Sequence, residues 1–319
     1  MRILFLGTPE FAVPSLAVLI ENGYEVVGVI TAPDKPAGRG QKLQLSAVKA
    51  YSLEKGLKIF QPLRLKDPDF LSDIKTLNAD LGIVVAFRMM PEVLFTMPRM
   101  GTINLHGALL PQYRGAAPIQ RAVMNGEKIT GVTTFFLNND IDTGKIIFRD
   151  EMEIYPEETG GQLHDRMMAK GAELVLKTVQ SIESGNYSLT AQEDFITPGE
   201  SLKSAPKIFK ADCKLNFSNA AEELLNLVRG LSPYPAAFIN LKNTSSGELA
   251  TVKIYLATYE KSTLSIPGKF FTDHQSFLKI GAVDGWLNIL EIQWPGKKRL
   301  KIMEFLRGFK WDDQWTLME

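Results

Sequence analysis

The 319-residue sequence contains one cysteine, Cys213, and only three histidines. A single cysteine excludes an internal disulfide and is typical of a reducing compartment. The histidines are scattered and form no cluster with metal-ligand spacing, so we expect no zinc or other metal site. No stretch approaches the roughly 20 apolar residues that span a membrane. The start lacks the basic segment and long apolar run of a signal peptide, and we therefore expect a cytoplasmic protein.

The sequence also has no net charge, with 36 basic and 36 acidic residues. Residues 1–205 hold 21 Lys and Arg against 24 Asp and Glu, and residues 206–319 hold 15 against 12. This asymmetry is too small to indicate a nucleic-acid partner by itself. The motif G-x-G-x-x-G is absent after the first apolar strand, and Glu10 would repel a pyrophosphate there. The sequence therefore excludes a nicotinamide-dependent enzyme.

The pattern of apolar residues predicts an α/β fold followed by a small β domain. A strand, a helix and a strand in succession indicate a parallel sheet, and they cover Arg2–Leu6, Phe11–Asn22 and Tyr24–Thr31. A long helix follows a capping box at Thr159–Gln162. Five short strands near the end predict a small barrel: Ala236–Leu241, Ala250–Tyr259, Gly268–Thr272, Phe277–Val283 and Trp286–Trp294. We expect domains at 1–190 and 207–319, joined by a linker at 191–206.

Three polar residues lie between Gly101 and Gly144 in a pattern that suggests a site. Asn104 and His106 are two apart on the expected strand Gly101–His106, so period-2 geometry puts them on one face. They lie near its carboxyl end, the edge at which open α/β sheets bind ligands. Asp142 follows the next expected strand on a turn.

An amide, an imidazole and a carboxylate at one place suit acyl transfer to a nucleophile that the substrate supplies. The amide can stabilise an oxyanion, the imidazole can carry a proton or donate to the same oxygen, and the carboxylate can orient the imidazole or accept a proton. A structural histidine and a plain Asp-Thr-Gly turn are the commoner alternative. An aspartic protease needs two such turns in an all-β fold, and the sequence has one.

Three separated motifs resemble the folate-dependent formyltransferases. They are Asn104-Leu-His106-Gly, Leu109-Leu-Pro-Gln-Tyr-Arg-Gly115 and Asp142-Thr-Gly144. The segments Gly115–Arg121 and Pro33–Leu43 resemble the branch of this family that acts on charged tRNA. The similarity covers nearly the whole chain and is densest up to about Tyr155. It implies a Rossmann-like formyltransferase domain with a parallel-rich sheet that binds folate, and then an OB-like β-barrel domain that binds tRNA.

The resemblance also implies a reaction. The formyl group of 10-formyltetrahydrofolate passes to the α-amine of methionyl initiator tRNA by direct attack of the amine. Asn104 and His106 would stabilise the oxyanion, and Asp142 would hold the His106 tautomer and assist removal of the amine proton. Which of His106 and Asp142 moves the proton stays open. The family also implies a cis peptide bond at Leu110–Pro111.

Further residues are assigned to binding by the resemblance. Folate is expected at two loops, through Phe87, Arg88, Met89, Ala108, Leu109, Leu110 and Pro111. Arg88 stands where most relatives carry glycine, and Ala108 where they often carry serine. Basic residues are expected to contact tRNA, namely Lys35, Arg39 and Lys42 in the loop Ala32–Leu43, and Lys207 and Lys210 after the linker.

Two alternatives remain beside this interpretation. A formyltransferase or a formyl-folate hydrolase that acts on a small molecule would carry the same Asn104, His106 and Asp142. A non-enzymatic RNA-binding protein would use the barrel alone and leave the three polar residues unexplained. We expect a monomer.

Overall fold

The computed structural model of the chain describes residues 1–37, 42–309, 311 and 314–318, and at Lys35–Ala37 and Lys42–Leu43 it describes the backbone alone. The chain forms two compact units. The first contains Met1–Pro118, Ile129–Glu153 and His164–Ala205, and the second contains Ile119–Lys128, Ile154–Leu163 and Pro206–Glu319.

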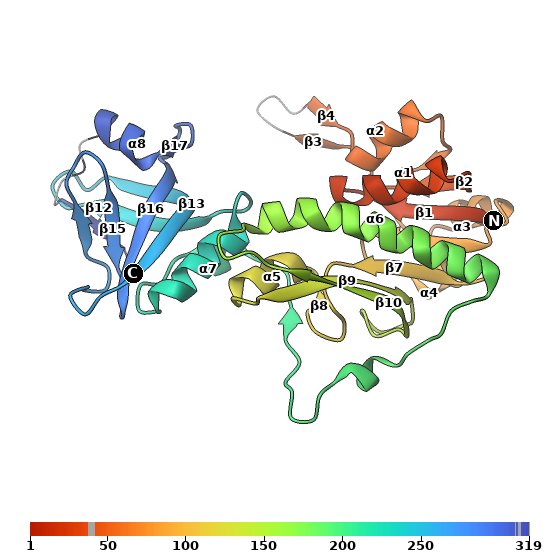
Figure 1. The fold of residues 1–319 in the computed structure, drawn as a ribbon. Coiled ribbons are helices and arrows are strands. Elements are labelled where there is room, and N and C mark those ends of the chain that lie inside the picture. Colours follow the sequence, from red (N-terminus) through yellow and green to blue (C-terminus); the bar gives the residue numbers. More distant parts are fainter. Residues whose placement is uncertain (38–41, 310, 312–313, 319) are drawn as a thin grey trace. The chain divides into compact units, whose positions relative to one another are not determined.

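The first unit is built on a seven-stranded sheet in the order β10-β9-β7-β6-β1-β2-β5 (Figure 1). The strands are β1 (Arg2–Gly7), β2 (Glu25–Ile30), β5 (Ile59–Phe60), β6 (Leu81–Val85), β7 (Thr102–His106), β9 (Ile129–Phe136) and β10 (Ile146–Glu153). The five from β7 to β5 run parallel, whereas β9 is antiparallel to β7 and β10 to β9. The expected parallel-rich α/β sheet is confirmed.

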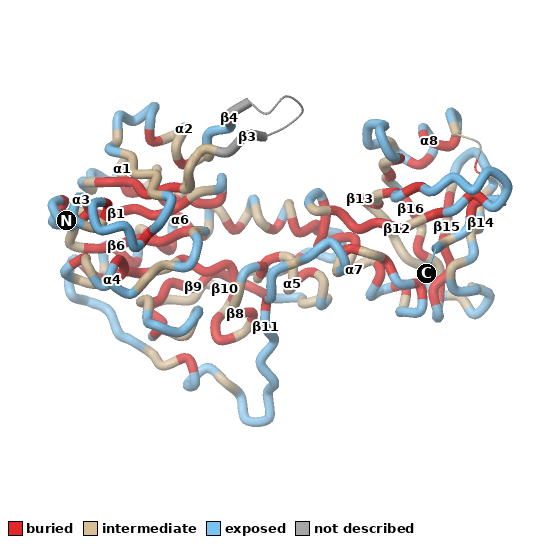
Figure 2. Tube along the Cα trace, turned by 180° about the vertical axis from the view of Figure 1, so that it is seen from behind, coloured by how far each residue is buried: buried red, intermediate tan, exposed pale blue. Residues whose placement is uncertain are grey.

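The centre of this sheet is buried, as the red colour along β1 and β6 in Figure 2 shows. Every residue of β6 is buried, and its sequence LGIVV is an unbroken apolar run. Such a run is typical of a parallel strand that is covered on both faces, because no position along it meets water. Ile3, Phe5 and Ile83 lose all their exposure in this core.

The first part of the chain contains several helices, including those expected at Phe11–Asn22 and after the capping box at Thr159–Gln162. They are the 3₁₀ helix η1 (Glu10–Ala12) and the α-helices α1 (Val13–Glu21), α2 (Ala47–Glu54), α3 (Pro68–Thr76), α4 (Glu92–Phe95), α5 (Pro118–Met124) and α6 (Gly160–Ser184). The capping box before α6 is confirmed, since Thr159 N–H donates to Gln162 Oε1 at 2.9 Å and Gln162 N–H donates to Thr159 Oγ1 at 3.3 Å. Within the described part of the chain, no helix is long and apolar enough to cross a membrane.

The stretch Ala32–Leu43, expected to be a loop, contains a short antiparallel pair. Strand β3 (Lys35–Ala37) pairs with β4 (Lys42–Gln44), and Lys35 lies opposite Gln44. The expectation of a plain loop was wrong here. Its proline and glycine content suggested a loop, but backbone pairing between two short segments leaves little trace in composition.

The segment from Thr190 to Ala205 lies on the first unit. It contains the 3₁₀ helix η2 (Gln192–Phe195) and the strand β11 (Ser204–Ala205), which pairs in parallel with β8 (Arg114–Gly115). Thr190 forms a bridge with Ile146, and Lys203 N–H donates to Gln112 Oε1 at 2.8 Å. The expected linker range 191–206 thus contains residues that are paired with Gln112 and with β8. The domain limits at 190 and 207 stay predictions.

The second unit carries an antiparallel sheet in the order β14-β15-β16-β13-β12-β18, with β17 paired to β16. Its elements are η3 (Lys210–Cys213), α7 (Ala221–Leu231), β12 (Ala237–Asn243), β13 (Leu249–Lys261), β14 (Phe270–Thr272), β15 (Leu278–Gly281), β16 (Gly285–Gln293), β17 (Leu300–Lys301), α8 (Ile302–Gly308) and β18 (Trp315–Leu317). The five expected strands are β12 to β16, and the small OB-like domain is confirmed. Sequence patterning missed the two short strands β17 and β18.

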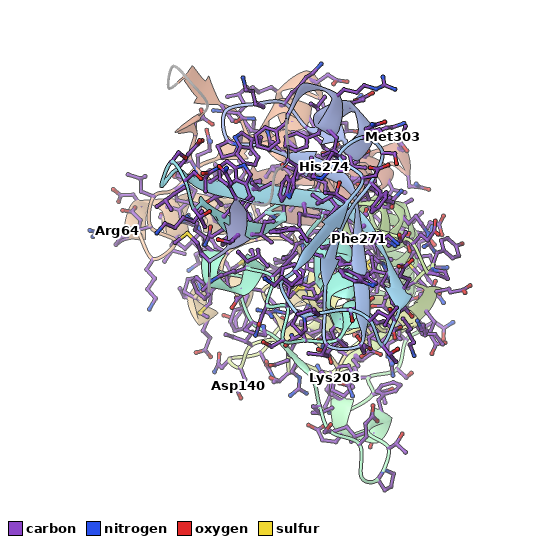
Figure 3. All side chains as sticks on the ribbon, turned by 90° about the vertical axis from the view of Figure 1, so that its left-hand side faces the viewer. Arg64, Asp140, Lys203, Phe271, His274 and Met303 are labelled. Carbon is purple, nitrogen blue, oxygen red and sulfur yellow. The ribbon has the colours of Figure 1, made fainter. Side chains whose placement is uncertain are left out.

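Aromatic rings pack together in one part of the largely aliphatic core of the second unit. The ring of Trp294 lies 4.4 Å from that of Phe309 and 5.1 Å from that of Trp315, between centroids. Other apolar side chains stay at the surface, including Phe271 and Met303, which are about half exposed (Figure 3).

The capping box gives a test of the fold. Thr159→Ala removes the side-chain oxygen that accepts from Gln162 N–H, and we expect it to lower the free energy of unfolding by ~1 kcal/mol. Urea unfolding measures this loss. Gln180→Ala, at an exposed position of the same helix, is the matched control and should change the stability by less than ~0.5 kcal/mol. Equal effects of both substitutions would contradict the role of the cap.

Candidate active site

His106 is the last residue of β7, and its ring is almost completely buried. Its Nε2 lies 2.8 Å from the main-chain oxygen of Tyr113. A carbonyl oxygen only accepts hydrogen bonds, so Nε2 carries the proton and donates it. In the neutral ring Nδ1 is therefore the unprotonated nitrogen. The expectation that Asp142 sets the tautomer is corrected by this geometry, because the carbonyl of Tyr113 does so.

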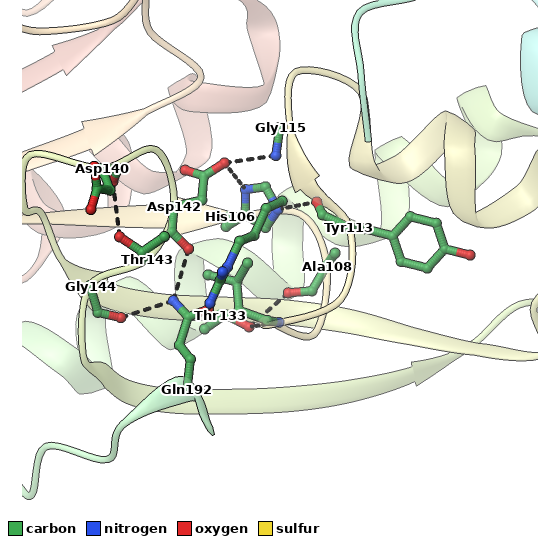
Figure 4. Close-up of polar contacts among 12 residues, drawn as sticks. His106, Ala108, Tyr113, Gly115, Thr133, Asp140, Asp142, Thr143, Gly144 and Gln192 are labelled. Carbon is green, nitrogen blue, oxygen red and sulfur yellow. Dashed lines mark hydrogen bonds and ion pairs between the residues drawn. The ribbon is translucent and has the colours of Figure 1, made fainter. Parts of the chain in front are cut away.

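Asp142 is brought to His106 by a turn that folds back along the sheet (Figure 4). Strand β9 is antiparallel to β7, and its last residue, Phe136, pairs with Ile103 near the start of β7. The turn then returns, so that Asp142 Oδ2 lies 3.8 Å from His106 Nδ1. The same oxygen accepts a hydrogen bond of 2.9 Å from Gly115 N–H. Two of the three motifs that resemble the family are joined by that bond.

Burial decides the charge of the imidazole. Removal of His106 from water lowers its pKa below the usual range, and the nearby Asp142 carboxylate and the hydrogen bond to Tyr113 only partly oppose this effect. The ring is consequently neutral at pH 7. Its Nδ1 lone pair and the Asp142 carboxylate then form two neighbouring proton acceptors.

Asn104 is half-buried in the middle of β7, where it pairs with Val84 on one side and Phe135 on the other. Alternation along the strand puts its side chain on the same face as that of His106. Among the residues that the structure describes, none makes a hydrogen bond with the Asn104 amide, which stays available for a substrate oxygen. The structure brings His106 and Asp142 into contact range and puts Asn104 on their face.

The loop after β7 is held by one hydroxyl group. Thr133 Oγ1 donates to Ala108 O at 2.7 Å and accepts from Leu110 N–H at 3.1 Å. Leu110–Pro111 is a cis peptide bond, as expected. Ala108, Leu110 and Pro111 are buried, so Leu109 is the partly exposed residue among these four.

The loop after β6 turns sharply at Ala86, which has φ +48°. The guanidinium of Arg88 donates to Leu63 O at 3.2 Å and to Pro62 O at 2.5 Å. Arg88 therefore reaches toward the loop after β5, and its neighbour Met89 is 75% exposed. The half-buried Phe87 completes this second expected folate loop.

The residues expected to contact tRNA are separated along the chain. Lys35 and Lys42 belong to β3 and β4, whereas Arg39 lies outside the described residues. Lys207 and Lys210 are exposed in the second unit on either side of Phe209, which is itself 63% exposed. Their role in binding stays a prediction.

Sequence patterning missed Gln192 and Thr133 as parts of this site. Gln192 is 1% exposed, and its side-chain amide bonds both the Asp142 turn and Arg114. Gln192 lies in a segment without periodicity, and Thr133 looks like any strand threonine, so neither carried a signal in the sequence. Within the described residues, no three His, Cys, Asp or Glu side chains are grouped to hold a metal ion.

Two protein-family models match successive parts of the chain. A family model described as formyl transferase matches residues 1–179, and one described as the formyl transferase C-terminal domain matches residues 207–310. The chain belongs to the formyl transferase family.

Its relatives include proteins named methionyl-tRNA formyltransferase. The one from Flavobacterium johnsoniae is 49% identical over 98% of each chain, and the one from Bacteroides thetaiotaomicron is 48% identical over 99% of this chain and 98% of its own.

Solved structures share the fold at lower identity. An N-formyltransferase from Helicobacter canadensis, in complex with folinic acid and dTDP-3-aminofucose, is 20% identical with a TM-score of 0.65, over 94% of this chain and 100% of its own. HypX from Aquifex aeolicus, in complex with tetrahydrofolic acid, is 19% identical with a TM-score of 0.63, over 100% of this chain and 51% of its own.

The lowered pKa of His106 predicts a pH dependence of stability. The unfolded chain protonates this histidine at about pH 6.5, whereas the folded chain does so only at lower pH. The part of the free energy of unfolding that comes from neutral His106 is therefore fully present above about pH 6.5. It is lost as the pH falls toward the pKa of His106 in the folded state. Urea unfolding at about pH 8 and pH 5.5 should show this loss. His106→Asn should reduce the difference between the two conditions, and an unchanged difference would contradict the burial effect.

Proposed function

We propose that this protein transfers the formyl group of 10-formyltetrahydrofolate to the α-amino group of methionyl initiator tRNA. The observation that carries the proposal is the neutral His106 with its Nδ1 3.8 Å from Asp142, on the face of the sheet that also bears Asn104. This arrangement occurs in a chain that is 46–49% identical, over nearly its whole length, to relatives named methionyl-tRNA formyltransferase.

His106 is the group that takes the proton from the attacking amine. Because Nε2–H is committed to Tyr113 O, the proton must enter at Nδ1. The imidazolium that forms lies beside the Asp142 carboxylate, which stabilises its charge. The amine nitrogen bonds to the formyl carbon, the bond from that carbon to folate N10 breaks, and the proton is delivered to N10.

Asn104 donates its amide N–H to the oxyanion of the tetrahedral intermediate. In its neutral form His106 has no free N–H for that oxygen, because the one it carries is bound to Tyr113 O. It shares the oxyanion role only after protonation at Nδ1. This order of events refines the joint role expected for Asn104 and His106.

Folate contacts are assigned to the loops at Phe87–Met89 and Ala108–Pro111. The second loop is fixed by Thr133 and leaves Leu109 partly exposed, which suits apolar contact with a planar pterin ring. Arg88 differs from the glycine of most relatives, but its guanidinium is engaged by Pro62 and Leu63, so it leaves the backbone of its loop available.

A charged tRNA is favoured over a small acceptor. The relatives at 46–49% identity carry the tRNA enzyme's name, whereas the sugar N-formyltransferase structures are about 20% identical. We assign phosphate contacts to Lys35, Arg39, Lys42, Lys207 and Lys210, since basic side chains supply most of the affinity for nucleic acid. We further infer a monomer that works in the cytoplasm, where translation initiates.

Asn104→Ala tests the oxyanion role. The substitution removes one donor, and we expect kcat to fall by about 10²–10³ with little change in KM for either substrate. The measurement is the rate of formyl transfer from 10-formyltetrahydrofolate to methionyl-tRNA. Near-normal turnover would contradict the assignment.

Arg39→Ala tests the acceptor. Loss of a phosphate contact should raise KM for methionyl-tRNA and leave folate binding unchanged, and the effect should shrink as salt is raised. Glu10→Ala, near the end of β1, serves as a control that leaves both constants unchanged. An equal loss of tRNA formylation and folate binding would favour a small acceptor.

A further inference from the structure

We propose that Gln192 is a positioning residue for catalysis, which holds the Asp142 turn in its reactive place through four hydrogen bonds. The inference rests on the proposed function of Asp142 and extends it to a residue outside the three motifs that resemble the family. Gln192 lies 50 residues after Asp142 and 78 after Arg114, yet it bonds both. Figure 4 shows its bonds to the main-chain oxygens of Asp142 and Gly144.

The amide of Gln192 connects the backbone of the Asp142 turn to the guanidinium of Arg114. Its Nε2 donates to the main-chain oxygens of Asp142 at 2.8 Å and Gly144 at 2.9 Å. Its Oε1 accepts from Arg114 Nε at 2.9 Å and from Arg114 Nη2 at 2.6 Å. Two N–H donors and two acceptor positions are the full capacity of a glutamine side chain, and all are used.

This pattern fixes the orientation of the amide. Turned over, it would point its oxygen at two carbonyl oxygens and its N–H groups at the guanidinium of Arg114. Since Gln192 is 1% exposed, water cannot replace the lost bonds, and each unsatisfied buried group would be costly. The amide therefore acts as a rigid link of defined direction.

The turn needs such support. Asp142 has φ +54°, a left-handed conformation that is uncommon outside glycine, although aspartate adopts it more readily than most residues. At Gly144, a Cβ atom would lie 1.7 Å from Phe136 O, so the backbone there is packed against β9. Gln192 bonds the carbonyls on both sides of Thr143 and thereby determines where the Asp142 carboxylate points.

The bonds of Gln192 also hold the Arg114–Gly115 segment, which lies on the other side of Asp142. Arg114 precedes Gly115, whose N–H donates to Asp142 Oδ2. Strand β11 pairs with Arg114–Gly115, and the Thr190 bridge to Ile146 anchors the other end of the segment. Gln192 thus sits on a segment attached at both ends, and a shift of it would move the carboxylate relative to His106.

Two substitutions separate positioning from folding. Gln192→Met keeps the length of the side chain and removes all four bonds. Gln192→Glu keeps the acceptor for Arg114 and replaces the two donations with an oxygen that faces two carbonyls. We expect kcat for formyl transfer to methionyl-tRNA to fall by about 10²-fold in the first and at least ~10-fold in the second, because small misplacements of reacting groups have effects of this size. KM for both substrates should stay within about twofold.

Thr178→Val is the matched control. It removes a buried hydroxyl that hydrogen-bonds Thr134 on β9, in the same unit. We expect it to lower the unfolding temperature without a change in kcat. If Gln192→Met does not fold, Gln192→Glu alone decides, because it retains the pairing with Arg114. Wild-type kcat in a folded Gln192→Glu protein would overturn the inference, and so would a change confined to KM.

A double-mutant cycle shows whether Gln192 acts through Asp142. In an Asp142→Asn background, Gln192→Glu should cause less than about a twofold further loss in single-turnover rate, because the group that it positions is already gone. If Gln192→Glu lowers the rate by the same factor in the Asp142→Asn background as in the wild-type protein, the inference is overturned while the proposed function stands. A wild-type protein that transfers no formyl group to methionyl-tRNA would instead overturn the proposed function itself.

Discussion

The hydrogen bond from Gly115 N–H to the Asp142 carboxylate is the contact on which the site depends. It joins two segments that lie 27 residues apart and belong to different loops of the sheet. Together with the link through Gln192, it ties the turn after β9 to the loop after β7 and keeps the carboxylate beside His106. The bond is directional and charge-assisted, so it fixes position as well as proximity. The sheet forms one side of the site, and the Asp142 turn that this bond holds forms the other.

The chemistry follows from where the two ring nitrogens of His106 are directed. One is committed to a backbone carbonyl, and the other faces Asp142. In the proposed mechanism, burial keeps the ring neutral until an amine brings a proton, and the carboxylate then favours the charged form. A base of this kind needs neither a nucleophile nor a metal ion from the protein to promote attack by an amine on a formyl carbon. Fold, burial and charge thus converge on one reaction class.

Much of the first unit was predictable because its signals are local. The apolar run of β6, the capping box at Thr159 and the shared face of Asn104 and His106 all come from periodicity or short spacing. The return of the Asp142 turn to His106 was expected from the family resemblance and not from strand geometry, since β9 runs antiparallel to β7 and the rule for parallel strand ends does not apply to it. The tautomer of His106 depends on a carbonyl that only the folded loop delivers. Gln192 acts through tertiary contacts alone, so no sequence pattern marked it.

The central claim is that Asn104, His106 and Asp142 surround one formyl carbon. A crystal structure of the protein with 5-formyltetrahydrofolate tests it most directly. The account predicts that the formyl group lies on the face of β7, with its oxygen in hydrogen-bond range of the Asn104 amide and its carbon within about 4 Å of His106 Nδ1. A bound ligand whose formyl group lies away from these side chains, or an Asn104 amide that points elsewhere, would contradict it.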